Sequence, residues 1–137
     1  MTNKPMTMIL GFDPGRDKCG MAITDQKGNP HYHKVVDSEQ AIVILNSLLQ
    51  EYSISLVVMG NQTTSKQWKQ KLEAKLLTSI PIIMVDERNS SVEARDRYWE
   101  MYPPKGLTCL IPQGLRVPPR PIDDIVAVLL IERYLKR

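Results

Sequence analysis

Acidic side chains stand at three places in this sequence where an apolar run ends or a helical pattern begins. They are Asp13, Asp86, Glu87, Asp123 and Asp124. Carboxylates that meet in a fold repel one another and raise one another's pKa values. Mg²⁺ and Mn²⁺ prefer carboxylate and water oxygens, and two such ions about 4 Å apart can activate a water and stabilise the leaving oxygen of a phosphodiester. If these acids converge, they predict metal-dependent phosphodiester hydrolysis with two ions.

Each of these acids also has a purely structural explanation. Asp13 is followed by Pro14-Gly15, and Asp-Pro-Gly forms turns readily, since proline fixes φ and glycine permits φ > 0. Asp123 and Asp124 would stand in the first turn of a helix, where carboxylates favour the positive end of the helix dipole. Both explanations stay open from the sequence. No Ser-His-Asp arrangement, Walker loop or GxGxxG motif in the sequence favours a different chemistry.

Apolar periodicity predicts the elements that must bring the acids together. Strands are predicted at residues 8–13, 20–23, 31–36, 54–59 and 81–85, and helices at about 38–52, 65–77, 90–101 and 122–135. Short turns with Gly and Pro join the first three strands, which predicts an antiparallel meander. Residues 54–59 are apolar on both faces, which is typical of a central strand with a parallel neighbour. The order predicts an α/β fold with a five-stranded mixed sheet, whose parallel strands end at one edge.

Two of the predicted helices open on a capping box, in which a Ser or Thr and a later Glu or Gln bind the free N–H groups of the first turn. The pairs are Thr64 with Gln67, and Ser90 with Glu93. In the predicted third strand, His31 and His33 share one face. A surface pair on an edge strand explains them better than a metal site, because no third ligand is near.

Composition places the chain among ordinary globular proteins. Its 137 residues fit one domain over residues 1–137, with 42% hydrophobic and 24% charged residues. The net charge of +3 is compatible with binding to a polyanion but is too small to predict it. No apolar run is long enough for a membrane span, and the first residues lack the apolar core of a secretion signal. Cys19 and Cys109 are isolated, so we expect free thiols and a cytoplasmic protein.

Basic side chains near these segments are candidates for nucleic-acid contact. They are Arg16, Lys18, Arg88, Arg116 and Arg120. The last two belong to residues 101–121, an irregular stretch that holds six of the ten prolines. A loop of that length is usually either functional or a flexible linker, so it is a basic flap beside an active site or a plain excursion. An ordinary solvated surface explains each of the five basic residues as well as a binding role does.

Four segments, in this order, resemble the YqgF/RuvX family, which belongs to the RNase H-like superfamily that also contains the RuvC Holliday-junction resolvases. They are Gly11-Phe-Asp-Pro-Gly-Arg-Asp-Lys-Cys-Gly20, Val58-Met-Gly60, Val85-Asp-Glu-Arg88 with Glu93-Ala94, and Ile122-Asp-Asp-Ile-Val-Ala127 with Leu130 and Tyr134-Leu135. Each motif alone is weak, but the ordered set covers nearly the whole chain. The sequence departs from the family at Lys18, at Asn61-Gln62 and at Asn89-Ser-Ser91, which bears on the choice of substrate.

The resemblance implies an RNase H-like fold and a nuclease that uses Mg²⁺ or Mn²⁺. Its catalytic acids correspond to Asp13, Glu87 and Asp123, with Asp86 and Asp124 as adjacent candidate metal ligands. The family is described as processing the 5′ end of pre-16S ribosomal RNA and, alternatively, as resolving Holliday junctions. A resolvase cuts two strands together and needs a symmetric dimer, so a homodimer is a further expectation.

Two other functions remain open from the sequence. RNase H-like domains inside larger proteins can bind nucleic acid without turnover, and the mild basicity of the chain and its basic flap agree with such a module. A sugar-kinase-like phosphotransferase would share the Asp-x-Gly strand pair at residues 13–15, but the chain is too short for the paired domains of that class.

Overall fold

The structure, a computed structural model, describes residues 7–61 and 64–136 of the chain. In these residues the strands are β1 (Met8–Asp13), β2 (Lys18–Thr24), β3 (Pro30–Asp37), β4 (Ile54–Gly60) and β5 (Ile82–Val85). The α-helices are α1 (Ala41–Glu51), α2 (Ser65–Lys75), α3 (Ser90–Met101) and α4 (Asp123–Leu135). Gln62, part of one departure from the family pattern, lies outside the described residues.

The strands form one mixed sheet in the order β3-β2-β1-β4-β5. The first three strands pair antiparallel, whereas β4 pairs parallel with β1 and β5 pairs parallel with β4. This confirms the predicted antiparallel meander followed by parallel strands. The carboxyl ends of β1, β4 and β5 therefore share one edge of the sheet, and the start of β2 lies at the same edge.

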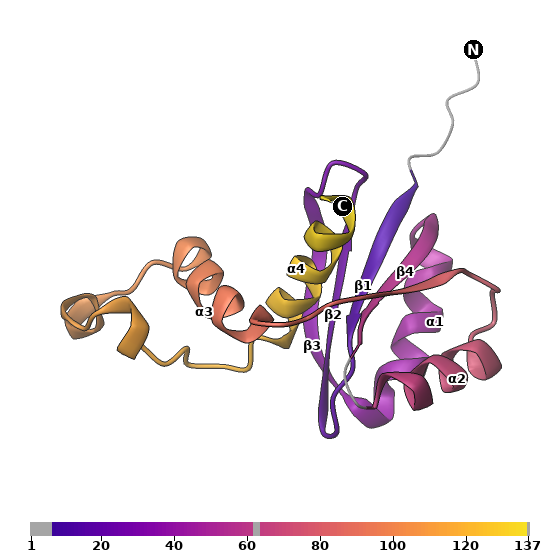
Figure 1. Ribbon diagram of the computed structural model, residues 1–137, viewed down its shortest axis with the longest axis horizontal. Coiled ribbons are helices and arrows are strands. Elements are labelled where there is room, and N and C mark those ends of the chain that lie inside the picture. The colour runs from indigo at the N-terminus through magenta and orange to yellow at the C-terminus, as the bar shows by residue number, and fades with distance from the viewer. Residues whose placement is uncertain (1–6, 62–63, 137) are drawn as a thin grey trace, which may run out of the picture.

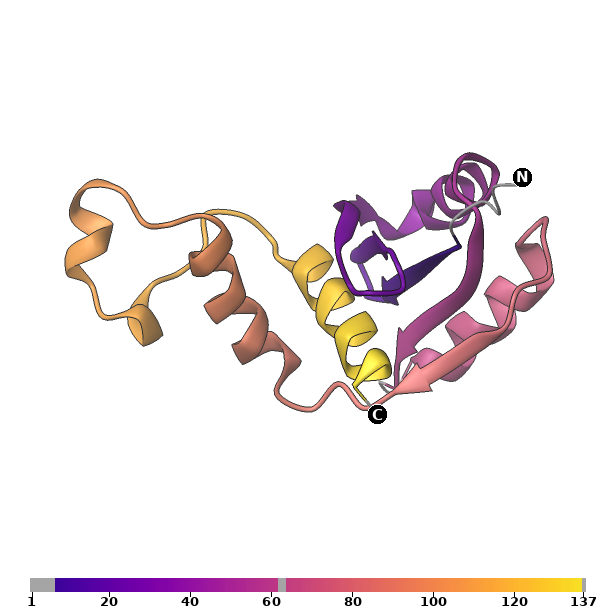
Figure 2. The same cartoon turned by 90° about the horizontal axis from the view of Figure 1, so that it is seen from above.

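Helices cover both faces of the sheet (Figures 1 and 2). Because side chains alternate along a strand, each strand feeds two cores. On one face, Phe12 and Met59 pack in a core with Leu45 of α1 and Leu72 of α2. On the other face, the sheet packs against α4, and α3 packs on α4 from the far side.

α4 lies unusually close to the sheet because two strand residues have no side chain. A Cβ placed on Gly11 of β1 would be 2.4 Å from the carbonyl oxygen of Ala127, and a Cβ on Gly20 of β2 would be 1.8 Å from that of Asp123. Both distances are well inside van der Waals contact, so these positions require glycine. The helix itself is apolar on its buried side, where Ile125 to Ile131 are all buried. Main-chain contact with β1 and β2 therefore fixes where α4 begins.

Both predicted capping boxes are wrong. Thr64 does stand at the start of α2, but its ψ of 0° is not the extended conformation of a capping residue, and its side chain caps no N–H. α3 is preceded by Asn89 rather than Ser90, with φ 62°, and no side-chain cap forms there either. A short 3₁₀ turn, Ser38–Gln40, comes before α1, so that α-helix begins later than predicted. At these helix starts, the backbone conformation imposed by the connection from strand to helix overrides the local capping pattern.

The chain between α3 and α4, residues 102–122, is here named the excursion. It contains two 3₁₀ turns, Gly106–Leu110 and Gln113–Leu115, and projects away from the sheet beyond α3 (Figures 1 and 2). Four of its large aliphatic side chains are 73–81% exposed: Leu107, Leu110, Leu115 and Val117. Of the helices in the described residues, none has the length and apolar content required to traverse a membrane.

Candidate active site

Asp13 closes β1 and is buried at the edge of the sheet where the parallel strands end. Across the ladder between β1 and β2 it lies opposite Gly20. The chain then turns through Pro14 and Gly15 and returns at Lys18, so tightly that a Cβ on Gly15 would be 2.1 Å from the carbonyl oxygen of Lys18. Asp13 therefore lies at this edge of the sheet, as the sequence predicts.

Asp123 reaches the same edge from the first turn of α4. Its carbonyl oxygen lies directly over Gly20, the neighbour of Asp13, and its side chain comes within hydrogen-bond reach of Asp13. Burial raises the pKa of Asp123 and the neighbouring Asp124 raises it further, while hydrogen bonds with its own backbone N–H and with Asp13 act in the opposite direction. Two carboxyl groups from opposite ends of the chain thus form a pair.

Glu87 follows β5 and lies against the end of β4. A Cβ on Gly60, the last residue of β4, would be 2.5 Å from Glu87 Oε2, so the bare glycine backbone makes room for this carboxylate. Burial raises the pKa of Glu87, as does Asp86, whereas Arg133 lowers it. Because β4 is the strand next to β1, Glu87 stands at the same edge of the sheet as Asp13.

Asp86 stands on the solvent side of the turn that follows β5. Its Oδ1 accepts the backbone N–H of Arg88 at 2.9 Å, and its carbonyl oxygen accepts a hydrogen bond from Nη1 of Arg133 at 2.7 Å. The turn ends at Asn89, whose left-handed conformation asparagine adopts more readily than most residues. Arg133 belongs to α4, so this turn is tied to the helix that carries Asp123.

Asp124 lies in a different environment from Asp123. It is buried, its Oδ2 accepts a hydrogen bond from Nδ1 of His33 at 2.6 Å, and its Oδ1 accepts one from Nη1 of Arg120 at 3.0 Å. The sequence assigned His33 to a surface pair with His31, and that assignment is wrong for His33. The only sequence signal was the shared face of the two histidines, which cannot reveal a partner 91 residues away.

The basic candidates divide between the edge of the sheet and the excursion. Arg16 is exposed in the turn after β1, and Lys18, at the start of β2, forms an ion pair with Asp37. Arg88 is exposed on the turn after β5. All three therefore lie in or beside turns at the edge of the sheet where the parallel strands end.

The two candidates in the excursion lie against α3. The guanidinium carbon of Arg116 is 5.7 Å from the ring centroid of Trp99, and its Nε donates to the carbonyl oxygen of Ile111 at 2.8 Å. Arg120 lies at the return of the excursion, where it meets Asp124. The two ends of the excursion meet beside Asp124, where Tyr102 and Arg120 line one hollow, whereas its middle projects away from the sheet (Figure 1).

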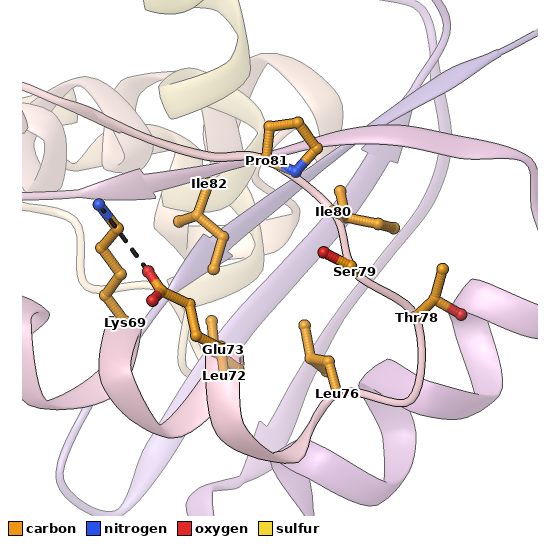
Figure 3. A pocket seen from close by; sticks show the side chains of 9 residues that line it. All are labelled: Lys69, Leu72, Glu73, Leu76, Thr78, Ser79, Ile80, Pro81 and Ile82. Carbon is orange, nitrogen blue, oxygen red and sulfur yellow. Dashed lines mark ion pairs between the residues drawn. The ribbon is translucent and has the colours of Figure 1, made fainter.

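One hollow is lined in part by Asp86 and another by Asp124, and neither is lined by Asp13, Glu87 or Asp123. One of about 550 Å³ beside the turn after β5 includes Arg88 and Arg133, and one of about 490 Å³ beside the start of α4 includes Lys18 and Arg120. A hollow of about 530 Å³ between α2 and the segment leading to β5 is lined mostly by aliphatic side chains (Figure 3). None of the five acids lines this third hollow, so we assign it no part in the chemistry.

The donors at the edge are carboxylate oxygens, which Mg²⁺ and Mn²⁺ prefer. Burial raises the pKa values of Asp123 and Glu87, so their charged forms are costly here, and a divalent cation would relieve that cost. As the side chains stand, residues 7–61 and 64–136 contain no group of three His, Cys, Asp or Glu residues arranged to hold a metal. The acid pair therefore fits a cation as two of its ligands, with Glu87 one strand away.

A five-stranded mixed sheet with an acid at the end of its first strand and another at the start of its last helix defines the RNase H-like class of α/β domains. Within that class the chain belongs to the RuvX family, because the family model, described as Holliday junction resolvase, matches residues 7–137. The predicted fold and the predicted family are both confirmed.

Three relatives share the name "Putative pre-16S rRNA nuclease". The one from Sulfurihydrogenibium sp. is 26% identical and the match covers 96% of this chain and 92% of the relative. The one from Coxiella burnetii (strain Dugway 5J108-111) is 28% identical over 94% and 92% of the two chains, and the one from Psychrobacter sp. is 31% identical over 94% and 77%. Among solved structures, the ethanolamine utilization protein EutJ from Carboxydothermus hydrogenoformans is 16% identical, with a TM-score of 0.43 over 68% of this chain and 41% of that one.

Proposed function

We propose that this protein is a nuclease that hydrolyses phosphodiester bonds of structured RNA with the help of Mg²⁺ or Mn²⁺, and that its substrate is the 5′ end of the 16S ribosomal RNA precursor. The observation that carries the proposal is the contact between Asp13 and Asp123 at the carboxyl edge of the sheet. Burial makes the charged form of a carboxyl group costly, and a divalent cation bound by both groups would relieve that cost.

The chain's own residues divide the work between holding the cation and holding the strand. Asp13 and Asp123 would hold the cation, and Glu87 would complete the set from the end of the neighbouring strand. When bound, the cation supplies an activated water and offsets the charge that develops on the leaving oxygen. Asp86 and Asp124 make other contacts, so we give them no catalytic part.

Cations beside the acids support binding of a phosphate backbone. Arg88 and Arg133 line the hollow that includes Asp86, and Arg16 is exposed in the turn after Asp13. Guanidinium groups bind phosphate oxygens through paired N–H donors, so these side chains would orient the strand across the acid pair. Burial raises the pKa of the Cys19 thiol, which argues against that residue as a nucleophile.

Two findings favour different substrates. The names of the relatives favour the ribosomal RNA precursor, whereas the description of the family model favours a four-way DNA junction. A junction resolvase requires a symmetric dimer that cuts two strands together. The oligomeric state in solution therefore bears on the choice: a monomer argues for the RNA substrate.

The test is cleavage of a pre-16S fragment and of a four-way junction, side by side, with and without Mn²⁺. The wild type should cut the RNA only with Mn²⁺, and Asp13→Asn and Asp123→Asn should each abolish cutting. Asp96→Asn is the matched control, because it makes the same change on an exposed helix position, where the carboxylate accepts a hydrogen bond from Gln113. Cutting of the junction alone would favour the second candidate. Binding without cleavage of either substrate, or cleavage unaffected by both acid substitutions, would overturn the proposal.

A further inference from the structure

A buried polar cluster joins β3, the excursion and α4 at Asp124. Only 2% of Asp124 is exposed, yet both of its carboxylate oxygens are occupied. Oδ2 accepts a hydrogen bond from Nδ1 of His33 at 2.6 Å and one from Nη2 of Arg120 at 3.3 Å, and Oδ1 accepts one from Nη1 of Arg120 at 3.0 Å. A buried carboxylate that is fully bonded in this way anchors the residues that bond it.

Each donor to Asp124 is itself held in place. His33 lies opposite Ala22 across the ladder between β2 and β3, and that small side chain leaves the space in which the imidazole meets α4. The guanidinium carbon of Arg120 is 5.5 Å from the ring centroid of Tyr98 and 5.7 Å from that of Tyr102. Three different elements thus hold the first turn of α4 from the side away from β1.

Asp123 lies in the same first turn of α4, and its main chain is the second place where that turn is held. Its carbonyl oxygen rests on Gly20, so a change in the tilt of the turn would move the Asp123 side chain relative to Asp13. A displacement of about 1 Å in a reacting group can reduce a rate about 100-fold. The cluster and Gly20 together leave the turn little freedom.

We infer that His33, Asp124 and Arg120 form a positioning cluster for Asp123, and that Asp124 is not a metal ligand. The inference rests on the proposed nuclease function, since it concerns how that site is held. A cation could bind Asp124 only by displacing a histidine and an arginine that already satisfy both oxygens. The two adjacent acids therefore have different roles. Asp123 would bind the cation beside Asp13, and Asp124 holds the first turn of α4 in place through His33 and Arg120.

The test compares His33→Gln, Asp124→Asn, their double variant and Arg120→Gln, with Asp96→Asn as the matched control. In Mn²⁺-dependent cleavage, His33→Gln, Asp124→Asn and Arg120→Gln should each lower the rate at saturating substrate by about 10- to 100-fold and change KM by less than about threefold, whereas Asp96→Asn should keep the wild-type rate. The double variant should be no slower than Asp124→Asn alone, because both substitutions break one cluster. Arg120→Lys, which keeps the charge, should recover part of the rate lost in Arg120→Gln.

Calorimetric titration with Mn²⁺ gives a readout independent of turnover. Asp124→Asn should bind as many Mn²⁺ ions per chain as the wild type, whereas Asp123→Asn should bind fewer. Full activity in His33→Gln, or loss of a bound ion in Asp124→Asn, would overturn the cluster while leaving the nuclease proposal intact. An inactive wild type that binds no Mn²⁺ would overturn the nuclease proposal instead. Thermal melting of every variant identifies any that loses activity by unfolding. If Arg120→Gln unfolds, Arg120→Lys takes its place in the comparison of rates.

Discussion

Substitution of Gly20 by alanine should disturb both the fold and the acid pair. The new Cβ would lie 1.8 Å from the carbonyl oxygen of Asp123 and 2.7 Å from the backbone nitrogen of Asp124. These are main-chain atoms, so no side chain can swing aside. The start of α4 would have to move by about 1.5 Å to reach ordinary contact distance.

The expected cost follows from that displacement. Overpacking of a well-filled core costs about 1–3 kcal/mol, and the upper part of that range applies because backbone must move. For a chain of this size, about 2–3 kcal/mol corresponds to a melting temperature lower by about 7–10 °C. If Asp123 moves with the helix, Mn²⁺-dependent cleavage should fall by about 100-fold.

The measurement is thermal unfolding followed by circular dichroism, together with the cleavage assay. Gly114→Ala is the matched control, because nothing lies within 4 Å of its new Cβ. That control should unfold within about 0.5 kcal/mol of the wild type. If Gly20→Ala instead melts and cleaves like Gly114→Ala, then α4 does not rest on β2 at this point and the pairing of Asp123 with Asp13 is refuted.

Three further predictions concern Gly60, Asp25 and the binding of Mn²⁺. Gly60→Ala should lower cleavage while leaving the melting temperature within about 2 °C of wild type, because the nearest atoms to its Cβ belong to the end of the Glu87 side chain, 2.5 Å away, rather than to backbone; a large loss of stability would contradict this. Hydrogen bonds from Asn29 and Lys27 lower the pKa of Asp25 from 3.8 to about 2, so its stabilising effect is present above the ordinary value and is lost as pH falls through about 2. The stability difference between wild type and Asp25→Ala in urea should therefore shrink between about pH 5 and about pH 2, and a constant difference would count against it. Saturating Mn²⁺ should stabilise the wild type, by about 2.7 kcal/mol at a hundred times its Kd, but not Asp13→Asn, and equal stabilisation of both would place the ion elsewhere.

The sequence predicts the sheet well because its strands are marked by local signals. Apolar runs bounded by Gly and Pro identify the strands, and the double-sided run before Gly60 identifies β4 as a central strand. Asp13 is predictable at the edge for the same reason, since Pro14 and Gly15 end β1 directly after it.

The contacts that complete the site are not predictable in this way. The pairing of Asp123 with Asp13 depends on Gly20, whose role appears only when α4 is placed against β2. The partnership of His33 with Asp124 depends on the register between β2 and β3, and on the direction of α4. Neither register nor helix direction leaves a local pattern in the sequence. The two capping boxes failed for another reason, since the chain enters α2 and α3 through Thr64 and Asn89 in conformations that form no side-chain cap.

The main-chain contact of α4 with two glycines has a consequence for which substitutions such a protein can accept during evolution. Where a helix meets a sheet through side chains, each core substitution alters the spacing between them. Here main chain meets main chain at Gly11 and Gly20, so the spacing at these two points does not depend on which aliphatic residues fill the rest of the core. The hydrophobic interior can therefore drift through many combinations while the geometry of the acid pair is inherited unchanged.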